Sequence, residues 1–240
     1  MNKPKWVVVF DFDGTLTSKN LVSLFDVIDR AMPEEHMVQL KLMRDKYIKK
    51  AHAGLLTKNE ESSWFFETVD LYVRAGLSIS KIEEVMHLVR LRNGVVECLK
   101  WLKCRHIPVA IISYGVAQFI EAALKSNDAL HLVSRIYAGK LIIDSIGLVK
   151  GLNTEYLVFP SNKGAYSRRF SESFSVSYRR ILAVGDSGSD AKLGYLKENR
   201  FGITNNEVEA EKLKNCMGGV VITENFEPVS RWLAEKINLE

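Results

Sequence analysis

The sequence contains little cysteine, and this scarcity limits the sites that it can build. Its three cysteines, Cys98, Cys104 and Cys216, are odd in number, and their spacing matches no zinc-binding pattern. A disulfide framework of the kind found in small secreted domains is therefore excluded. We expect Cys98 and Cys104, which lie in an amphipathic stretch, to be ordinary reduced thiols that are buried or half-buried.

The sequence also lacks a long hydrophobic run and an excess of one charge. Its first apolar run, residues 6–10, ends at Asp11 and is too short for a signal peptide or a membrane span. The 33 basic and 29 acidic side chains give a net charge of +4, without a dense run of lysine or arginine. We therefore expect a cytoplasmic protein with no membrane partner and no nucleic acid polymer as its ligand.

Apolar, β-branched runs alternate with helical patterns through most of the chain. Residues 6–10 and 107–112 are apolar at almost every position, which is typical of strands buried on both faces of a parallel sheet. The alternation predicts an α/β fold with a Rossmann-like, three-layer core of one or two domains. The other predicted elements are strands over 180–184, 200–204 and 219–223, short strands within 132–159 with turns at Gly139, Gly147 and Gly151, and helices over 116–125, 163–170, 191–197 and 226–237.

Residues 17–91 interrupt this alternation. Apolar side chains recur there at helical spacing, as in Leu40, Met43 and Tyr47, and no convincing strand is present. Ser80 and Glu83 form a predicted capping box at the start of one helix. The segment is predicted to be a helical subdomain.

Acidic residues follow the predicted strands. Asp11 and Asp13 lie two positions apart after the first strand, so their carboxylates are expected to project together and to need a cation. Mg²⁺ prefers such oxygen ligands and leaves positions open for phosphate. One carboxylate can attack phosphorus, and a second can protonate the leaving alcohol and then activate water. Asp186 and Asp190, after another strand, can complete the metal site.

Other residues near the strand ends can bind a phosphoryl group. Ser113 follows the strand 107–112, and the backbone amides of Tyr114 and Gly115 are expected to add donors at a helix start. Lys163, with a helix start directly after it, can neutralise the charge that develops in the transition state.

Together these motifs resemble those of the haloacid dehalogenase-like superfamily of phosphohydrolases. The matching segments are Asp11-Phe12-Asp13-Gly14-Thr15, Ser113, Lys163, and Gly185-Asp186 with Asp190. The resemblance implies that Asp11 is the nucleophile and Asp13 the general acid/base. It also implies that Mg²⁺ binds the Asp11 carboxylate, the Asp13 backbone carbonyl and Asp186, while Asp190 supports the metal's waters or holds Lys163.

The layout is most similar to the phosphoserine phosphatase and pyrimidine 5'-nucleotidase branches. Local likeness to the nucleotidases lies in Leu55-Leu56-Thr57 followed by Glu60 and Glu61. The resemblance implies a catalytic core over 1–16 and 92–240, a helical cap over 17–91, and a small phosphorylated metabolite as substrate, such as a nucleoside monophosphate or a phosphoserine-like compound.

Several alternatives stay open from the sequence. The same residues suit a phosphotransferase or mutase, and a non-catalytic binding protein could keep the fold, although the complete motif set argues against the latter. Dehalogenation does not need a second carboxylate, so the presence of Asp13 argues against a dehalogenase. We expect Trp64, Phe65 and Phe66 to pack rather than to stack on a nucleobase, and Glu60 and Glu61 to lie at a solvated helix start rather than clamp a substrate.

Overall fold

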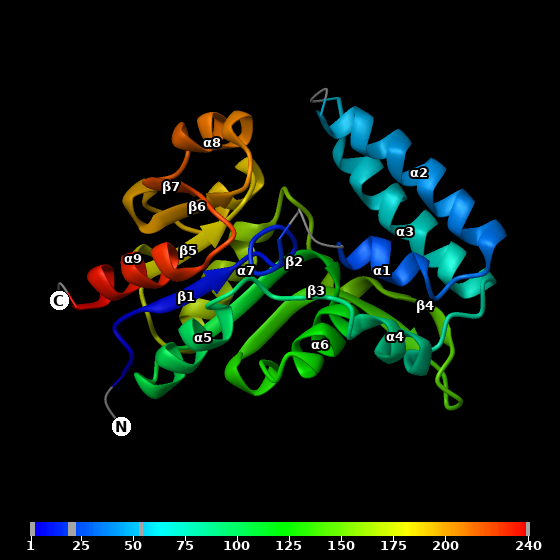
Figure 1. Ribbon diagram of the computed structural model, residues 1–240, viewed down its shortest axis with the longest axis horizontal. Coiled ribbons are helices and arrows are strands. Elements are labelled where there is room, and N and C mark those ends of the chain that lie inside the picture. Colours follow the sequence, from blue (N-terminus) through cyan, green and yellow to red (C-terminus); the bar gives the residue numbers. More distant parts are fainter. Residues whose placement is uncertain (1–2, 19–22, 53–54, 239–240) are drawn as a thin grey trace.

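A computed structural model describes residues 3–18, 23–52 and 55–238. Figure 1 shows a central sheet with helices around it and a pair of long helices, α2 and α3, at one end. The strands are β1 (Val7–Phe10), β2 (Val109–Val116), β3 (Arg135–Ile143), β4 (Val149–Asn153), β5 (Ile181–Gly185), β6 (Arg200–Thr204) and β7 (Gly219–Ile222). The α-helices are α1 (Leu24–Asp29), α2 (Glu34–His52), α3 (Lys58–Arg74), α4 (Ile79–Met86), α5 (Val95–Cys104), α6 (Ala117–Ser126), α7 (Lys163–Ser173), α8 (Glu207–Lys214) and α9 (Glu227–Asn238).

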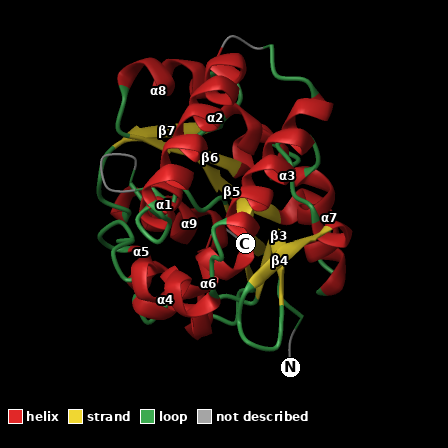
Figure 2. Cartoon of the chain, turned by 90° about the vertical axis from the view of Figure 1, so that its right-hand side faces the viewer, coloured by secondary structure: helices red, strands yellow, loops and turns green. Residues whose placement is uncertain are grey.

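The seven strands form one sheet in the order β4-β3-β2-β1-β5-β6-β7. All neighbours are parallel except β3 and β4, which form an antiparallel pair at the edge. Helices lie on both sides of this sheet (Figure 2). The predicted α/β fold with a Rossmann-like parallel sheet is therefore confirmed. Among the described residues, no helix has the length and apolar character to cross a membrane.

Strand β1 is completely buried because its side chains alternate between two hydrophobic layers. Val8 and Phe10 face the larger layer, whereas Val7 and Val9 face a smaller one that includes Phe170 of α7. A strand covered on both faces needs apolar residues at every position, which is what its β-branched sequence provides. This strand therefore occupies the middle of the sheet, with Asp11 at its carboxyl end.

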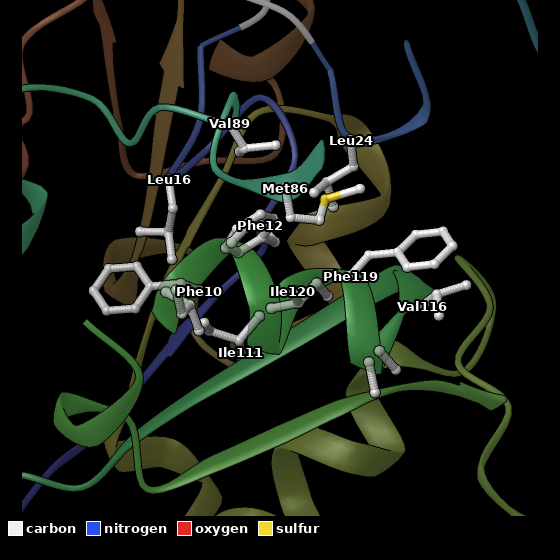
Figure 3. Close-up of a cluster of buried hydrophobic side chains, with 14 of the residues drawn as sticks. Phe10, Phe12, Leu16, Leu24, Met86, Val89, Ile111, Val116, Phe119 and Ile120 are labelled. Atoms are coloured by element: carbon white, nitrogen blue, oxygen red, sulfur yellow. The ribbon is translucent and has the colours of Figure 1, made fainter. Parts of the chain in front are cut away.

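Helices of residues 24–86 share the larger layer with the sheet. Leu24 of α1 and Met86 of α4 pack into the same cluster as Phe10 and Ile111 (Figure 3). The helical segment thus buries its apolar side chains against the sheet and has no separate core among the described residues. Of the isolated bridges, Thr17 with Leu91 joins the two ends of the segment 17–91, and Ser78 with Leu148 joins this segment to the residues just before β4.

Several local expectations are wrong. Helix α4 begins after Ser78, whose hydroxyl accepts from the amide of Lys81, so the predicted Ser80 capping box is not used. Gly139 lies inside β3 rather than in a turn. Residues 191–197 form no α-helix; short 3₁₀ turns at Gly188–Lys192 and Lys197–Asn199 take its place. Cys98 is buried as expected, but Cys104 is exposed at the end of α5.

Candidate active site

The register of the sheet brings the ends of β1 and β5 together. Phe10 pairs with Ile111 of β2 on one side and with Val184 of β5 on the other. Asp11 follows Phe10 directly, and its amide donates to the Val184 carbonyl at 3.0 Å. Because the carboxyl ends of parallel strands meet at one edge, the residues after β1 and β5 lie close together there.

Three carboxylates and one ammonium group meet at this edge. Asp11, Asp186 and Asp190 are 7%, 3% and 1% exposed, and one carboxylate oxygen of each lies within 4.8 Å of the others. The Nζ of Lys163 donates to Oδ1 of Asp11 at 2.8 Å and to Oδ1 of Asp190 at 2.6 Å. When all four groups are ionised, the cluster carries two net negative charges in a buried position.

This excess of negative charge affects the pKa values of the cluster. Burial raises the pKa of Asp11 well above its usual value, and Asp190 and Asp186 raise it further against the opposing effect of Lys163. Burial disfavours the ammonium form of Lys163, but the carboxylates of Asp11 and Asp190 outweigh it and raise the pKa of that lysine. Hard oxygen ligands that are short of positive charge are the donor set that Mg²⁺ prefers, so these residues fit a divalent cation.

Asp190 organises the loop after β5. Its Oδ2 accepts hydrogen bonds from the amide of Asp186 at 3.2 Å, and from the amide and hydroxyl of Ser187 at 2.9 and 2.7 Å. Gly185 permits this close approach, since a Cβ there would lie 2.1 Å from the Cβ of Asp190. Both Asp190 oxygens thus accept from protein donors, Oδ1 from Lys163 and Oδ2 from the loop.

Asp13 lies apart from the three buried carboxylates. It is half-buried, and its Oδ1 accepts from the Thr17 hydroxyl at 3.0 Å. The same hydroxyl oxygen accepts from the amide of Gly14, a residue with a φ of +81° that reverses the chain. Thr15, between them, donates its hydroxyl to Oδ1 of Asp186 at 3.2 Å. The turn after β1 therefore contacts both Asp13 and the buried cluster.

Ser113 is buried within a bulge of β2. Between the pairs Ile112–Tyr137 and Val116–Gly139, β2 advances four residues while β3 advances two. The predicted strand end at Ser113 is wrong, because β2 continues to Val116 and α6 begins at Ala117. The amides of Tyr114 and Gly115 thus belong to β2 and not to a helix start, and their role as phosphate donors stays a prediction.

The start of α3 reaches β2 and the loop before α7, close in sequence to Ser113 and Lys163. The Tyr114 hydroxyl donates to the backbone carbonyl of Glu61 at 2.6 Å, and the Ser161 hydroxyl donates to the Glu61 carboxylate at 3.3 Å. Glu61 therefore contacts both segments instead of lying only in solvent. Glu60 caps the helix through Thr57 and pairs with Lys50.

The aromatic residues of α3 mostly pack. Trp64 stacks on Tyr47, with ring centres 5.5 Å apart and an interplanar angle of 10°, and meets the Tyr114 ring edge-on at 5.8 Å. Phe65 is buried, as expected. Phe66 is exposed, so the expectation of packing is wrong for this residue.

The sequence assigned no role to three residues that contact the site, namely Thr15, Thr17 and Arg92. Thr15 stands within the Asp11–Thr15 motif, so its role could have been inferred from that motif. Thr17 and Arg92 act through a contact between segments that are 75 positions apart, which no local pattern indicates.

The geometry has counterparts among known proteins. A sequence model of the pyrimidine 5'-nucleotidase (UMPH-1) family matches residues 12–214. This chain belongs to that family. A phosphoserine phosphatase of Methanocaldococcus jannaschii is 29% identical over 193 residues, which cover 80% of this chain and 82% of the relative. A 7-methylguanosine phosphate-specific 5'-nucleotidase A of Xenopus laevis is 24% identical and aligns over 85% of this chain and 77% of its own length.

Solved structures share the fold of this nucleotidase-family chain. Cytosolic 5'-nucleotidase IIIB bound to cytidine superposes with a TM-score of 0.77 at 21% identity, covering 98% of this chain and 88% of that one. A phospho-aspartyl intermediate analogue of phosphoserine phosphatase gives a TM-score of 0.69 at 22% identity, covering 96% and 99%. The resemblance to haloacid dehalogenase-like phosphatases is thereby confirmed, and the chain is a hydrolase of phosphoric monoesters.

Proposed function

We propose that the chain is a Mg²⁺-dependent phosphatase of small metabolites that works through an aspartyl-phosphate on Asp11. The observation that carries this proposal is the buried contact of Asp11 with Lys163 beside the carboxylates of Asp186 and Asp190. A carboxylate used only to cap a turn would not need a buried cation and two further acids around it.

In the proposed reaction, a carboxylate oxygen of Asp11 attacks phosphorus and the bond to the ester oxygen breaks. Asp13 gives its proton to that oxygen, and the alcohol leaves. Asp13 then takes a proton from a water molecule that attacks phosphorus, which releases inorganic phosphate and restores the Asp11 carboxylate. The half-buried position of Asp13, outside the acidic cluster, supports a role at the leaving-group side.

The predicted Mg²⁺ would be held by the carboxylates of Asp11 and Asp186 and by the backbone carbonyl of Asp13. When bound, it supplies positive charge that offsets the negative charge of the cluster and of the phosphoryl oxygens. Asp190, which the sequence predicts as part of the metal site, is assigned instead to holding Lys163 and the loop after β5, since its two oxygens already accept from those groups. Lys163, Ser113 and the amides of Tyr114 and Gly115 are assigned to the phosphoryl oxygens.

Residues 17–91 are proposed to act as a cap over this site, with the core formed by 1–16 and 92–240. The contacts of Glu61 with Tyr114 and Ser161 support this division, because they join the start of α3 to β2 and to the loop before α7, next to Ser113 and Lys163. A cap in this position would exclude water and select the leaving group. Family membership favours a nucleoside monophosphate as substrate, and phosphoserine is the second candidate.

The test is release of inorganic phosphate from nucleoside monophosphates, phosphoserine, sugar phosphates and phosphocholine, each with Mg²⁺, with Ca²⁺ and with a chelator. We expect turnover with Mg²⁺, weak turnover with Ca²⁺ because its looser coordination misplaces the phosphate, and none in chelator. Full activity in chelator would refute the metal role. Acceptor alcohols added to the same assay separate hydrolysis from phosphoryl transfer, since a transferase would form new esters in place of phosphate.

A further inference from the structure

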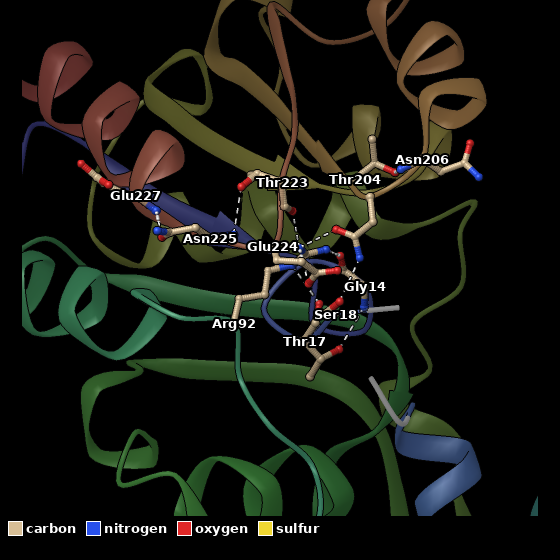
Figure 4. A network of polar contacts seen from close by, with 11 residues as sticks. Gly14, Thr17, Ser18, Arg92, Thr204, Asn206, Thr223, Glu224, Asn225 and Glu227 are labelled. Atoms are coloured by element: carbon tan, nitrogen blue, oxygen red, sulfur yellow. Dashed lines mark hydrogen bonds and ion pairs between the residues drawn. The ribbon is translucent and has the colours of Figure 1, made fainter. Parts of the chain in front are cut away.

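Arg92 is a buried cation outside the catalytic cluster. It lies between the helical segment and α5, and its side chain is 0% exposed. Figure 4 shows its guanidinium group surrounded by three loops. Burial of a charge is costly unless every donor is satisfied, and an apolar residue of similar size would often stabilise such a position equally well. An arginine here therefore calls for an explanation in terms of what it binds.

The guanidinium group binds both ends of the turn after β1. Its Nη2 donates to the carbonyl of Gly14 at 2.8 Å, and its Nε donates to the carbonyl of Thr17 at 3.1 Å. On its other side, Nη1 donates to Oδ1 of Asn205 at 2.8 Å and to the carbonyl of Thr223 at 2.6 Å, and it pairs with the Glu224 carboxylate at 3.5 Å. Asn205 follows β6, and Thr223 and Glu224 follow β7, so one side chain joins the turn after β1 to the loops after these two strands.

The turn that Arg92 holds is the one that positions Asp13. The Thr17 hydroxyl donates to Asp13 Oδ1 and accepts from the Gly14 amide, both at 3.0 Å. Gly14 and Thr17 are therefore residues of this turn whose carbonyls bind Arg92 and whose amide and hydroxyl take part in the contact with Asp13. The backbone amide of Arg92 donates to the Leu16 carbonyl at 2.8 Å, which fixes the same turn from a third point. A planar fork with several donors can hold these carbonyls in fixed directions, which a lysine ammonium cannot do.

We infer that Arg92 is a positioning residue for Asp13, acting through the Gly14 and Thr17 carbonyls to aim the carboxyl group at the leaving oxygen. This inference rests on the proposed function, in which Asp13 is the general acid. It predicts that changing Arg92 slows the reaction more for substrates whose leaving oxygen must be protonated than for substrates with a good leaving group.

The test compares Arg92→Lys with the wild-type chain on two substrates in Mg²⁺. An alkyl phosphate needs a proton on its leaving oxygen, whereas 4-nitrophenyl phosphate has a good leaving group and needs little help. We expect the loss of kcat/KM to be at least about 10-fold larger for the alkyl phosphate, because general acid catalysis contributes about 10²-fold or more where it is needed. Equal losses on both substrates, or no loss on either, would overturn the inference.

Thr17→Val tests the same link without changing Arg92, and it decides the matter if Arg92→Lys does not fold. It removes the hydroxyl that binds Asp13 but keeps the carbonyl, so the same preference for the good leaving group is expected. The double variant should show no larger preference than the stronger single variant, because both changes act through one contact. Equal effects of Thr17→Val on the two substrates would count against the inference.

Two controls separate this inference from its foundation. Arg44→Lys alters a partly buried arginine of the helical segment that pairs with Asp26 and Asp29, and it should change the two substrates equally. Asp13→Asn should itself show the leaving-group preference, and Arg92→Lys added to it should show no further preference. If Asp13→Asn shows none, the acid role of Asp13 fails. If Asp13→Asn shows it and Arg92→Lys does not, only the inference about Arg92 fails.

Discussion

The helical segment and the edge of the sheet each bury a cluster of charged side chains. In the helical segment, Arg44 of α2 donates from Nη2 to both carboxylate oxygens of Asp29 of α1, at 2.7 and 2.5 Å. Its Nη1 also contacts Asp26 at 3.2 Å, but the side chain of Asp26 is 60% exposed. The closest contact is thus one partly buried cation with one buried anion, in which a single nitrogen donates to both carboxylate oxygens.

At the edge of the sheet, the charges are not balanced in this way. Three buried carboxylates meet there: Lys163 pairs with Asp11 and Asp190, and Asp186 accepts from the Thr15 hydroxyl. The Arg44–Asp29 pair matches one cation with one anion, whereas we expect the acidic cluster to gain further stability from a bound cation. We infer that the ratio of the charges, more than their burial, separates a site that binds ligands from a structural pair.

The largest effect is expected from Asp11→Asn. Asparagine keeps the size of the side chain but removes the attacking oxygen charge, so kcat should fall by at least about 10³-fold. The far-ultraviolet circular dichroism spectrum should stay unchanged, since the surrounding strands are apolar. Phosphate release is the measurement, and wild-type turnover in this variant would end the nucleophile assignment.

Lys163→Met is expected to have the next largest effect. It leaves Asp11 and Asp190 without their shared cation and removes a charge that stabilises the transition state, so kcat/KM should fall by about 10²-fold. Lys192→Met, which alters an exposed lysine on the loop carrying Asp190, is the matched control and should retain activity within about twofold, as surface changes usually do. Similar losses in both variants would contradict the special role of Lys163.

Arg44→Met is expected to lower stability and to leave activity nearly unchanged, the opposite of the effects expected for Asp11→Asn and Lys163→Met. Breaking the buried pair leaves Asp29 without a partner and is expected to lower the free energy of unfolding by about 3 kcal/mol. Activity of the folded fraction should stay within about threefold, because this pair is complete in itself and lies in the helical segment. Urea unfolding and steady-state kinetics measure the two effects, and a catalytic loss without a loss of stability would break the comparison.

The smallest effect is a pH dependence at Asp29. Burial raises the pKa of Asp29 above 3.8 despite the opposing effect of Arg44. A carboxyl group whose pKa is raised by folding contributes stability that is present below its unfolded pKa and is lost as the pH rises through its folded pKa. Asp29→Asn does not titrate, so its stability relative to the wild type should rise with pH above 3.8, by no more than about 1.4 kcal/mol per pH unit. Thermal unfolding between acidic and neutral pH measures the difference in stability between Asp29→Asn and the wild type. A difference that falls as the pH rises would contradict the prediction.

Short-range patterns predicted much of the fold and of the acidic cluster. The apolar run before Asp11 and the run before Asp186 could only be buried strands, and the order of a parallel sheet then brings their ends together. Local signals gave wrong predictions where one residue type has two possible structural roles, or where two neighbouring residues suit the same role. Glycine at 139 serves close packing and not a turn, and Ser78 and Ser80 both suit a helix cap, so spacing alone selected the wrong serine.

Contacts between distant segments could not be predicted from local patterns. Arg92 and Thr17 are far apart in the sequence, and nothing in the residues around Arg92 indicates that its side chain is buried. The role of Asp190 could not be predicted for the same reason, because its Oδ2 accepts from amides of its own loop only when that loop is folded.

Gly139 also sets how near α3 can lie to the sheet. A Cβ at this position would stand 2.2 Å from Cζ of Phe65, well inside any permitted contact. The ring of Phe65 therefore rests directly on the backbone of β3, and a single methyl group there would act as a wedge under the helix. The same helix carries Glu61, which contacts Tyr114 and Ser161, so the absence of a side chain at position 139 sets how closely these contacts can form.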